Sequence, residues 1–330
     1  MENLQTCKCN IRYSVVIPVY GSGDWIFELT KGISNVLNQY KEKYEIILVN
    51  DCSPNENTWS KIVEACKLNK TIRAFNLMYN SGQPSATLCG LEQAEGEYII
   101  TMDDDFQHMP EELPKLIDAM KTNTNFDCIF GVFPEKMHSW IRRKGSEIYN
   151  YILDYIYKRP ENIKSTSFRI MKRDLAKLLV QCKTSHPQIG PMIFSMTKKI
   201  GNVPVNHKER AYGESGYTLN KLISETLFTV INISDIPMKI IGFLGRLSVV
   251  FSFIAIIYSM ITSNTNSDNQ ENRLIVILIS FIGGCILLGI CMLGNYIRRI
   301  LEELTGIPRY LIRHKYENNQ IEDRIKENDD

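Results

Sequence analysis

Short apolar runs alternate with amphipathic stretches through the first 131 residues of the chain. The runs have the length of buried strands, and the stretches between them carry apolar residues at helical spacing. The pattern predicts strands over 14–19, 45–49, 71–77, 98–102 and 127–131, and helices over 26–40, 58–68, 85–95 and 111–121. This alternation predicts an α/β fold with a doubly wound, mostly parallel sheet, in which ligands bind beyond the carboxyl ends of the strands.

Two longer apolar runs follow near the end of the chain. Residues 274–296 contain no charged side chain, and 23 helical residues are enough to cross a hydrocarbon core of about 30 Å. Residues 240–262 are apolar except for Arg246, whose long stem can reach the headgroups. Because the polar loop 263–273 joins the runs, a two-helix transmembrane hairpin over 240–296 is favoured, with buried core helices as the alternative.

Basic residues near these runs predict how the chain lies in the membrane. The loop between the runs carries only Arg273, whereas basic side chains are frequent after the second run: Arg298, Arg299, Arg309, Arg313 and Lys315. By the positive-inside rule, the front domain and the tail face the cytoplasm. The protein is therefore predicted to be a multi-pass protein of the cell (inner) membrane.

The remaining regions complete the predicted organisation. A flexible N-terminus, 1–12, precedes a domain over 13–217. Residues 218–239 carry apolar side chains at helical spacing, which predicts amphipathic helices in the membrane interface; helices packed on the front domain are the alternative. Residues 297–330 form a basic cytoplasmic tail, frayed from Glu317 onward. In the second run, three small residues could form a face on which the helices of a homo-oligomer pair, with ordinary membrane composition as the alternative: Ser280, Gly284 and Gly289.

Composition and charge narrow the class of protein. The chain is 44% hydrophobic and 23% charged, which is typical of a folded domain. Its 38 Lys and Arg residues balance 37 Asp and Glu residues, so the bulk charge gives no reason to expect a nucleic-acid partner. The nine cysteines are scattered and indicate reduced cytosolic thiols. Cys7 and Cys9 lack the second pair that a zinc site needs.

The strongest candidate chemistry follows the fourth predicted strand, at Asp103-Asp104-Asp105. Three adjacent carboxylates repel one another unless a cation neutralises them. Asp103 and Asp105 are alternate residues, on the same side of an extended backbone, and Gln107 adds another oxygen. This oxygen set suits Mg²⁺ or Mn²⁺ better than zinc. A solvated turn is the alternative.

Polar residues also follow the first two strands, and basic residues lie further along. Pro18 to Gly23 form a turn with exposed amides and an aromatic ring, and Asp51 is placed to accept hydrogen bonds from a base or ribose. A helix cap is equally consistent with Asp51. Downstream basic side chains could hold phosphates, although each alone is more typical of a surface ion pair: Arg142, Arg143, Lys144, Arg169, Lys208 and Arg210.

Taken together, these motifs resemble a known enzyme family. They are Val16-Ile17-Pro18-Val19-Tyr20, Val49-Asn50-Asp51-Cys52-Ser53, Asn80-Ser81-Gly82, Met102-Asp103-Asp104-Asp105-Phe106-Gln107-His108, Ser167-Phe168-Arg169 and Arg210-Ala211-Tyr212-Gly213-Glu214-Ser215, followed by the apolar hairpin. In this order, over residues 13–313, they resemble family 2 inverting glycosyltransferases of the GT-A fold, and more narrowly polyprenyl- or dolichyl-phosphate glycosyltransferases.

The resemblance implies a reaction and a role for each motif. The domain 13–217 would be a cytoplasmic catalytic domain that moves a sugar from a UDP- or GDP-linked donor to a polyprenyl phosphate. The implied nucleotide-sugar contacts are Pro18, Tyr20, Ser22, Asp51, Asp103 and Asp104, and the implied metal ligands for Mg²⁺ or Mn²⁺ are Asp103, Asp105 and Gln107. Asp105, Arg169 and Arg210 are assigned to catalysis, and Arg142, Arg143 and Ser167 to the acceptor phosphate.

Departures from the family pattern bear on mechanism and leave rival functions open. Some relatives have an aspartate, a candidate base, where this chain has Ser167. An acceptor phosphate with a second pKa of about 6 is already largely dianionic at cytosolic pH, so no protein base is expected. The rivals are a transferase acting on a saccharide or other lipid acceptor, and a membrane protein that binds a nucleotide-sugar without turnover.

Overall fold

The computed structural model describes residues 11–21, 25–55, 57–133, 163–182, 184, 187–206, 243, 247, 268–304, 308–317 and 320–323. The chain divides into two compact units, one formed by Met1–Glu214 with Pro308–Asp330 and the other by Ser215–Ile307. Three predicted regions lie outside the described residues: the N-terminus up to residue 10, the interfacial helices 218–239, and the first crossing 240–262 apart from Phe243 and Leu247.

The described strands of the first unit form one mixed sheet in the order β7-β5-β6-β4-β1-β2-β3-β8-β9. The strands are β1 (Tyr13–Val19), β2 (Tyr44–Asn50), β3 (Ile72–Leu77), β4 (Tyr98–Thr101), β5 (Cys128–Val132), β6 (Arg169–Lys172), β7 (Ile200–Pro204), β8 (Ile312–Glu317) and β9 (Gln320–Asp323). The four at the centre, β4-β1-β2-β3, are parallel, whereas β6 and β8 run antiparallel to their neighbours on either side. The predicted strands and the parallel centre of the sheet are confirmed.

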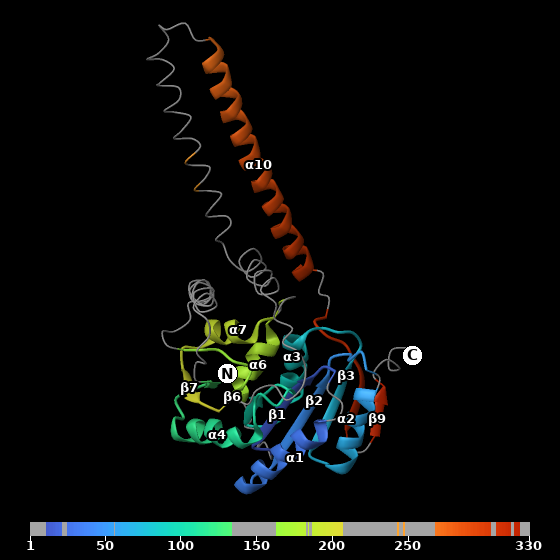
Figure 1. The fold of residues 1–330 in the computed structure, drawn as a ribbon. Helices are drawn as coiled ribbons and strands as arrows, with labels where there is room; N and C mark the ends of the chain where they lie inside the picture. The colour runs from blue at the N-terminus through green and yellow to red at the C-terminus, as the bar shows by residue number, and fades with distance from the viewer. Residues whose placement is uncertain are drawn as a thin grey trace, which may run out of the picture. The chain divides into compact units, whose positions relative to one another are not determined.

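Helices cover both faces of the sheet (Figure 1). One face carries α1 (Ile26–Leu37), α2 (Asn57–Leu68) and α4 (Leu113–Thr122), and the other carries α3 (Gln83–Gln93), α6 (Arg173–Gln181) and α7 (Ile189–Met196). Two short 3₁₀ turns, η1 (Asn38–Tyr40) and η2 (Pro110–Glu112), replace the end of one predicted helix and the start of another. The α/β sandwich expected from the alternating pattern is therefore present.

The central strands are buried on both faces, which explains their unbroken apolar runs. All seven residues of β1 are buried, and the side chains of Val15 and Val16 belong to the two separate cores above and below the sheet. Helix α3 packs closely on β1 because Gly90 has no side chain. A Cβ at Gly90 would lie 2.3 Å from Val16 Cγ1.

The C-terminal segment completes the sheet of the first unit. Strand β8 pairs antiparallel with β3, and β9 pairs with β8. Arg73 on β3 bridges Glu45 and Glu317, with nitrogen–oxygen distances of 2.6 Å to each carboxylate. The expectation that the tail frays from Glu317 onward is wrong for Gln320–Asp323, because main-chain pairing to a neighbouring strand orders them.

The described part of the second unit is dominated by α10 (Asp268–Leu304), a helix of 37 residues. The predicted second crossing, 274–296, lies within it. Among the described residues, no helix combines the length and the apolar character needed to span a membrane. The hairpin stays a prediction, as do the predicted domain boundaries.

Candidate active site

The turn after β1 is held by residues from two other strand ends. The Tyr20 amide donates to Asp104 Oδ2 at 3.2 Å, and the Gly21 amide donates to Ser53 Oγ at 3.0 Å. Gly21 has a φ of 78°, a conformation that glycine adopts without steric cost. The Tyr20 side chain is 53% exposed and stands beside the crevice. The turn therefore offers an aromatic ring to a ligand at the carboxyl end of the sheet.

Asp51 directly follows β2 and is buried against the turn that leads into α3. Its Oδ1 accepts the Ser81 amide at 2.7 Å. Burial raises the pKa of the Asp51 carboxyl, and hydrogen bonds from the Ser81 and Gly82 amides oppose that rise. Gly82 has a φ of 84°, which turns the chain into α3. Asp51 is thus a rigidly placed carboxyl group at the edge of the crevice.

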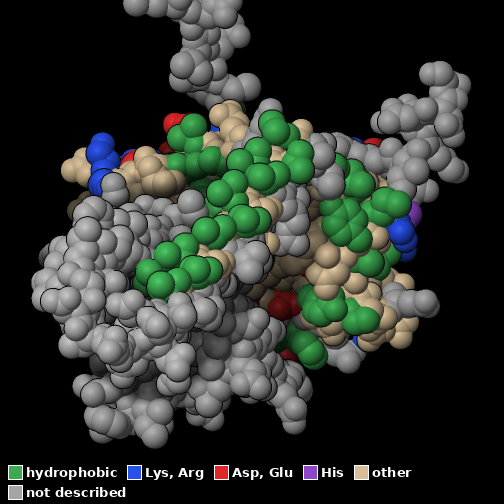
Figure 2. Space-filling view, turned by 90° about the horizontal axis from the view of Figure 1, so that it is seen from above, with side chains coloured by type: hydrophobic (Ala, Val, Ile, Leu, Met, Phe, Trp, Pro, Cys, Tyr) green, Lys and Arg blue, Asp and Glu red, His purple; other side chains and the backbone are tan. Residues whose placement is uncertain are grey.

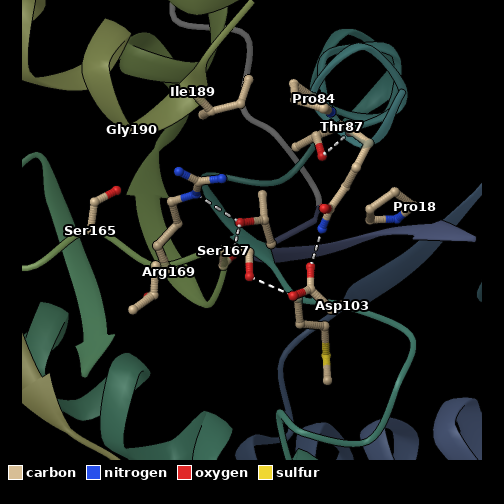
Figure 3. Close-up of a pocket in the computed structure, with 13 residues that line it drawn as sticks. Pro18, Pro84, Thr87, Asp103, Ser165, Ser167, Arg169, Ile189 and Gly190 are labelled. Carbon is tan, nitrogen blue, oxygen red and sulfur yellow. Dashed lines mark hydrogen bonds between the residues drawn. The ribbon is translucent and has the colours of Figure 1, made fainter. Parts of the chain in front are cut away.

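Both side-chain oxygens of Asp103 accept hydrogen bonds from neighbouring side chains (Figure 3). Its Oδ2 accepts the Ser167 hydroxyl at 2.6 Å, and its Oδ1 accepts the side-chain amide of Gln83. Its own amide donates to His108 Nδ1 at 3.1 Å. The His108 ring is buried between Phe133 and Phe168, with centroid distances of 5.5 and 5.0 Å. This hydrogen bond and the two stacked rings fix the backbone beneath Asp103.

The other two aspartates point to separate partners, which reduces the repulsion expected between neighbouring carboxylates. Asp104 accepts the Tyr20 amide through Oδ2, and its carbonyl accepts Trp25 Nε1 at 2.7 Å. Asp105 Oδ1 accepts the Gln107 amide at 3.1 Å. Phe106, directly after Asp105, has a φ of 58°, which is unusual for a residue with a side chain. The chain therefore turns sharply just after the three aspartates.

The donor set around Asp103 fits a divalent cation only in part. Within the described residues, no group of three or more His, Cys, Asp or Glu side chains is placed to hold a metal ion. Asp103 and Asp105 offer two hard carboxylates, and Gln107 a weaker amide oxygen. Mg²⁺ sites in proteins often take further ligands from substrate phosphates and water, so two carboxylates are enough for a site completed by a substrate.

A pocket of about 260 Å³ opens beside Asp103. It is lined by Pro18, Gln83, Pro84, Thr87, Thr101, Met102, Asp103, Ser165, Thr166, Ser167, Arg169, Ile189 and Gly190. Arg169 is only 5% exposed, and its Nε donates to Thr101 Oγ1 at 3.0 Å. Burial lowers the pKa of its guanidinium, and the Cys128 thiol and the Asp103 carboxylate oppose that fall. Thr101 in turn donates to the Ser167 carbonyl at 2.6 Å.

The structure brings some of the predicted site residues together and leaves others untested. Four of them line the same pocket: Pro18, Asp103, Ser167 and Arg169. The carboxyl-end loops that border it carry Tyr20, Asp51, Asp104, Asp105 and Gln107. Ser22, Arg142, Arg143 and Arg210 lie outside the described residues, so their predicted roles stay predictions.

Sequence reasoning missed several residues of the pocket. Gln83 directly follows the Asn80-Ser81-Gly82 motif, and that position was the available signal for its contact with Asp103. Thr87 lies one helical turn after Gln83. Ile189 and Gly190 open α7, and no motif in the sequence marks them. They reach the pocket only because α7 packs on the same face as α3.

The face seen in Figure 2 has a hollow in which acidic side chains lie. The Lys and Arg side chains of the described residues on that face are few and scattered. The expectation that the protein has no nucleic-acid partner stays a prediction.

Comparison with known proteins now decides the family. Residues 14–179, which carry β1 to α6 and most of the pocket, match the family model of glycosyl transferase family 2. The chain belongs to this family. It is therefore a glycosyltransferase, and the expected enzyme class is confirmed.

Individual relatives agree with this assignment. The chain is 28% identical over 311 residues to an undecaprenyl-phosphate 4-deoxy-4-formamido-L-arabinose transferase of Edwardsiella ictaluri, covering 93% of this chain and 95% of that protein. Glucosyl-3-phosphoglycerate synthase of Mycobacterium tuberculosis, solved with Mn²⁺, UDP and phosphoglyceric acid, aligns with a TM-score of 0.51 and 14% identity over 68% of this chain and 78% of that one. The same synthase solved with phosphoglyceric acid aligns with a TM-score of 0.50 and 16% identity, over 69% and 82%. At these identities, the two structures show a shared fold, the GT-A type expected from the sequence.

Proposed function

We propose that this glycosyltransferase moves a sugar from a nucleotide-sugar to a polyprenyl phosphate. The observation that carries the proposal is the nearly end-to-end match to a transferase whose name states undecaprenyl phosphate as the acceptor. A match that includes the apolar region as well as the catalytic domain favours a lipid acceptor over a soluble saccharide.

The arrangement of strand ends supports a donor site at the crevice. In this proposal the exposed ring of Tyr20 and the carboxyl group of Asp51 would contact the nucleoside, and Asp103 and Asp105 would hold its diphosphate through a cation. A divalent cation bound by these two carboxylates and the donor phosphates would stabilise the negative charge that develops on the leaving diphosphate. Mg²⁺ and Mn²⁺ both fit the oxygen ligands, and the Mn²⁺ in a structural neighbour is consistent with that class of ion.

The reaction needs no base from the protein. An oxygen of the acceptor phosphate attacks the anomeric carbon of the sugar, and the bond from that carbon to the donor diphosphate breaks as the nucleoside diphosphate leaves. The attacking phosphate is largely dianionic near pH 7, so it carries no proton that must be removed. The Ser167 hydroxyl donates a hydrogen bond to the Asp103 carboxylate, which suits a positioning residue better than a base. The chain would contribute mainly alignment of the two substrates and electrostatic stabilisation.

The site of reaction would be the cytoplasmic face of the cell membrane, with the chain anchored by the hairpin 240–296. The supporting observations are the two apolar runs and the basic residues that follow the second. Retention of the full-length chain in membranes washed at high pH would support this. Release of the chain into the wash would contradict it.

The decisive experiment supplies membranes containing the full chain with undecaprenyl phosphate and a panel of radiolabelled UDP- and GDP-sugars. We expect one donor to give label that partitions into organic solvent, and chelation of divalent cations to abolish it. Asp105→Asn should lower the rate by at least about a hundredfold, the usual loss when one group that stabilises developing charge is removed. Asp174→Asn, an exposed change on α6, is the matched control. Unchanged turnover in Asp105→Asn would refute the metal role, and no lipid product with any donor would refute the acceptor.

A further inference from the structure

Arg169 is a buried cation that forms no ion pair with a carboxylate in the described part of the protein. Its Nε donates to Thr101, its guanidinium carbon lies 5.9 Å from the centre of the Phe130 ring, and no ion pair joins it to a carboxylate among the described residues. Figure 3 shows the guanidinium extending into the pocket on the side of Ile189. The two terminal nitrogens of the guanidinium can therefore donate hydrogen bonds to a ligand in the pocket.

Asp103 is near enough to favour the charged form of Arg169, but no ion pair joins the two side chains. The two Asp103 oxygens accept hydrogen bonds from Gln83 and Ser167 instead. A charge held in a buried site without a partner is strongly unfavourable, and the penalty disappears when an anion binds with good geometry. Guanidinium groups match phosphate and carboxylate oxygens through two parallel hydrogen bonds.

The walls of the pocket combine polar and apolar surface, which suits a ligand whose small polar group is attached to an apolar part. Thr87, Ser165 and Thr166 bring hydroxyl groups, and Pro84 and Ile189 bring apolar surface. The start of α7 approaches the loop before β6 because Gly190 has no side chain: a Cβ there would lie 2.2 Å from Ser165 Oγ. A volume of about 260 Å³ is enough for a phosphate or a carboxylate-bearing sugar ring.

We propose that this pocket is an oxyanion subsite, in which Arg169 pairs with a phosphate or carboxylate oxygen of a substrate. The identity of the substrate rests on the proposed function, but the subsite itself does not. The oxyanion has two candidate sources, the phosphate monoester of the lipid acceptor and a carboxylate on the sugar of the donor. Both would place their charge within reach of Asp103 and the reacting centre.

The test measures binding without turnover, using the full chain in detergent with divalent cations chelated. The probes are inorganic phosphate, a short-chain prenyl phosphate, and UDP-linked glucuronic acid compared with UDP-linked glucose, each followed by the rise in melting temperature. We expect at least one anionic probe to bind at least about tenfold more weakly to Arg169→Gln than to the wild type. Lys172→Gln, which removes a partly exposed cation three residues away that does not line the pocket, should leave that affinity unchanged.

Each outcome decides the proposal. Loss of the prenyl phosphate response assigns the subsite to the acceptor, and loss of the preference for glucuronic acid over glucose assigns it to the donor. Arg169→Gln should melt no lower than the wild type in the absence of anion, because an unbalanced buried charge has been removed. A lower melting temperature with every anion response intact would show a merely structural arginine and overturn the proposal. If Arg169→Gln does not fold, Arg169→Lys, which keeps the charge but loses the forked geometry, must show the same weakening.

Discussion

Replacing Ser167 by alanine tests whether this residue positions Asp103 or performs chemistry. Its hydroxyl donates to Asp103 Oδ2 at 2.6 Å, whereas Gln83 holds the other oxygen. A hydrogen bond to a charged group contributes about 1.5–3 kcal/mol. Since Ser167 is only half-buried and lines an open pocket, water can replace part of the lost bond, and the lower end of that range applies. We expect kcat/KM to fall roughly tenfold in Ser167→Ala.

The assay is the initial rate of sugar transfer to lipid, measured over a range of divalent-cation and donor concentrations. Ser195→Ala removes a hydroxyl on the exposed side of α7 that donates to the Met192 carbonyl, and serves as the control. Ser167→Asp should also lose activity, because it places a second carboxylate against Asp103. A loss of about a thousandfold in Ser167→Ala with unchanged donor binding, or a gain in Ser167→Asp, would refute the base-free mechanism.

Three further changes test other parts of the structure. Gly90→Ala should lower the free energy of unfolding by about 1–3 kcal/mol in chemical denaturation, because its Cβ would overlap Val16; no loss would mean that α3 sits further from β1. Burial raises the pKa of Glu112, but Lys115 and Asn206 outweigh burial and hold this pKa below its ordinary value. Glu112 should therefore stabilise the fold above its unfolded pKa and lose this contribution as pH falls through its folded pKa. Glu112→Gln should therefore flatten the acid limb of stability, whereas exposed Glu111→Gln should not. Asp51→Asn should raise the KM for the donor by about tenfold, and an unchanged KM would remove Asp51 from the donor site.

The sequence alone determined the elements and the outline of the reaction. Runs buried on both faces, such as β1, read as strands because helices cover both sides of a parallel sheet. The order of motifs at the strand ends predicted the family and placed Pro18, Asp103, Ser167 and Arg169 at the site, since parallel strands bring their carboxyl ends to one edge. These features depend on the spacing of apolar residues and on the order of motifs along the chain, and both can be seen in the sequence.

Other features depend on contacts between residues far apart in the chain, and the tertiary structure alone decided them. Strand β8 joins the sheet beside β3 through main-chain hydrogen bonds and the Arg73–Glu317 pair. The charged sequence of the tail gives no sign of this pairing. Gly190 contributes to the pocket because α7 packs on the same face as α3. Arg169 looks like an ordinary surface cation in sequence, and it becomes a buried charge without a described counter-ion only after folding removes it from water.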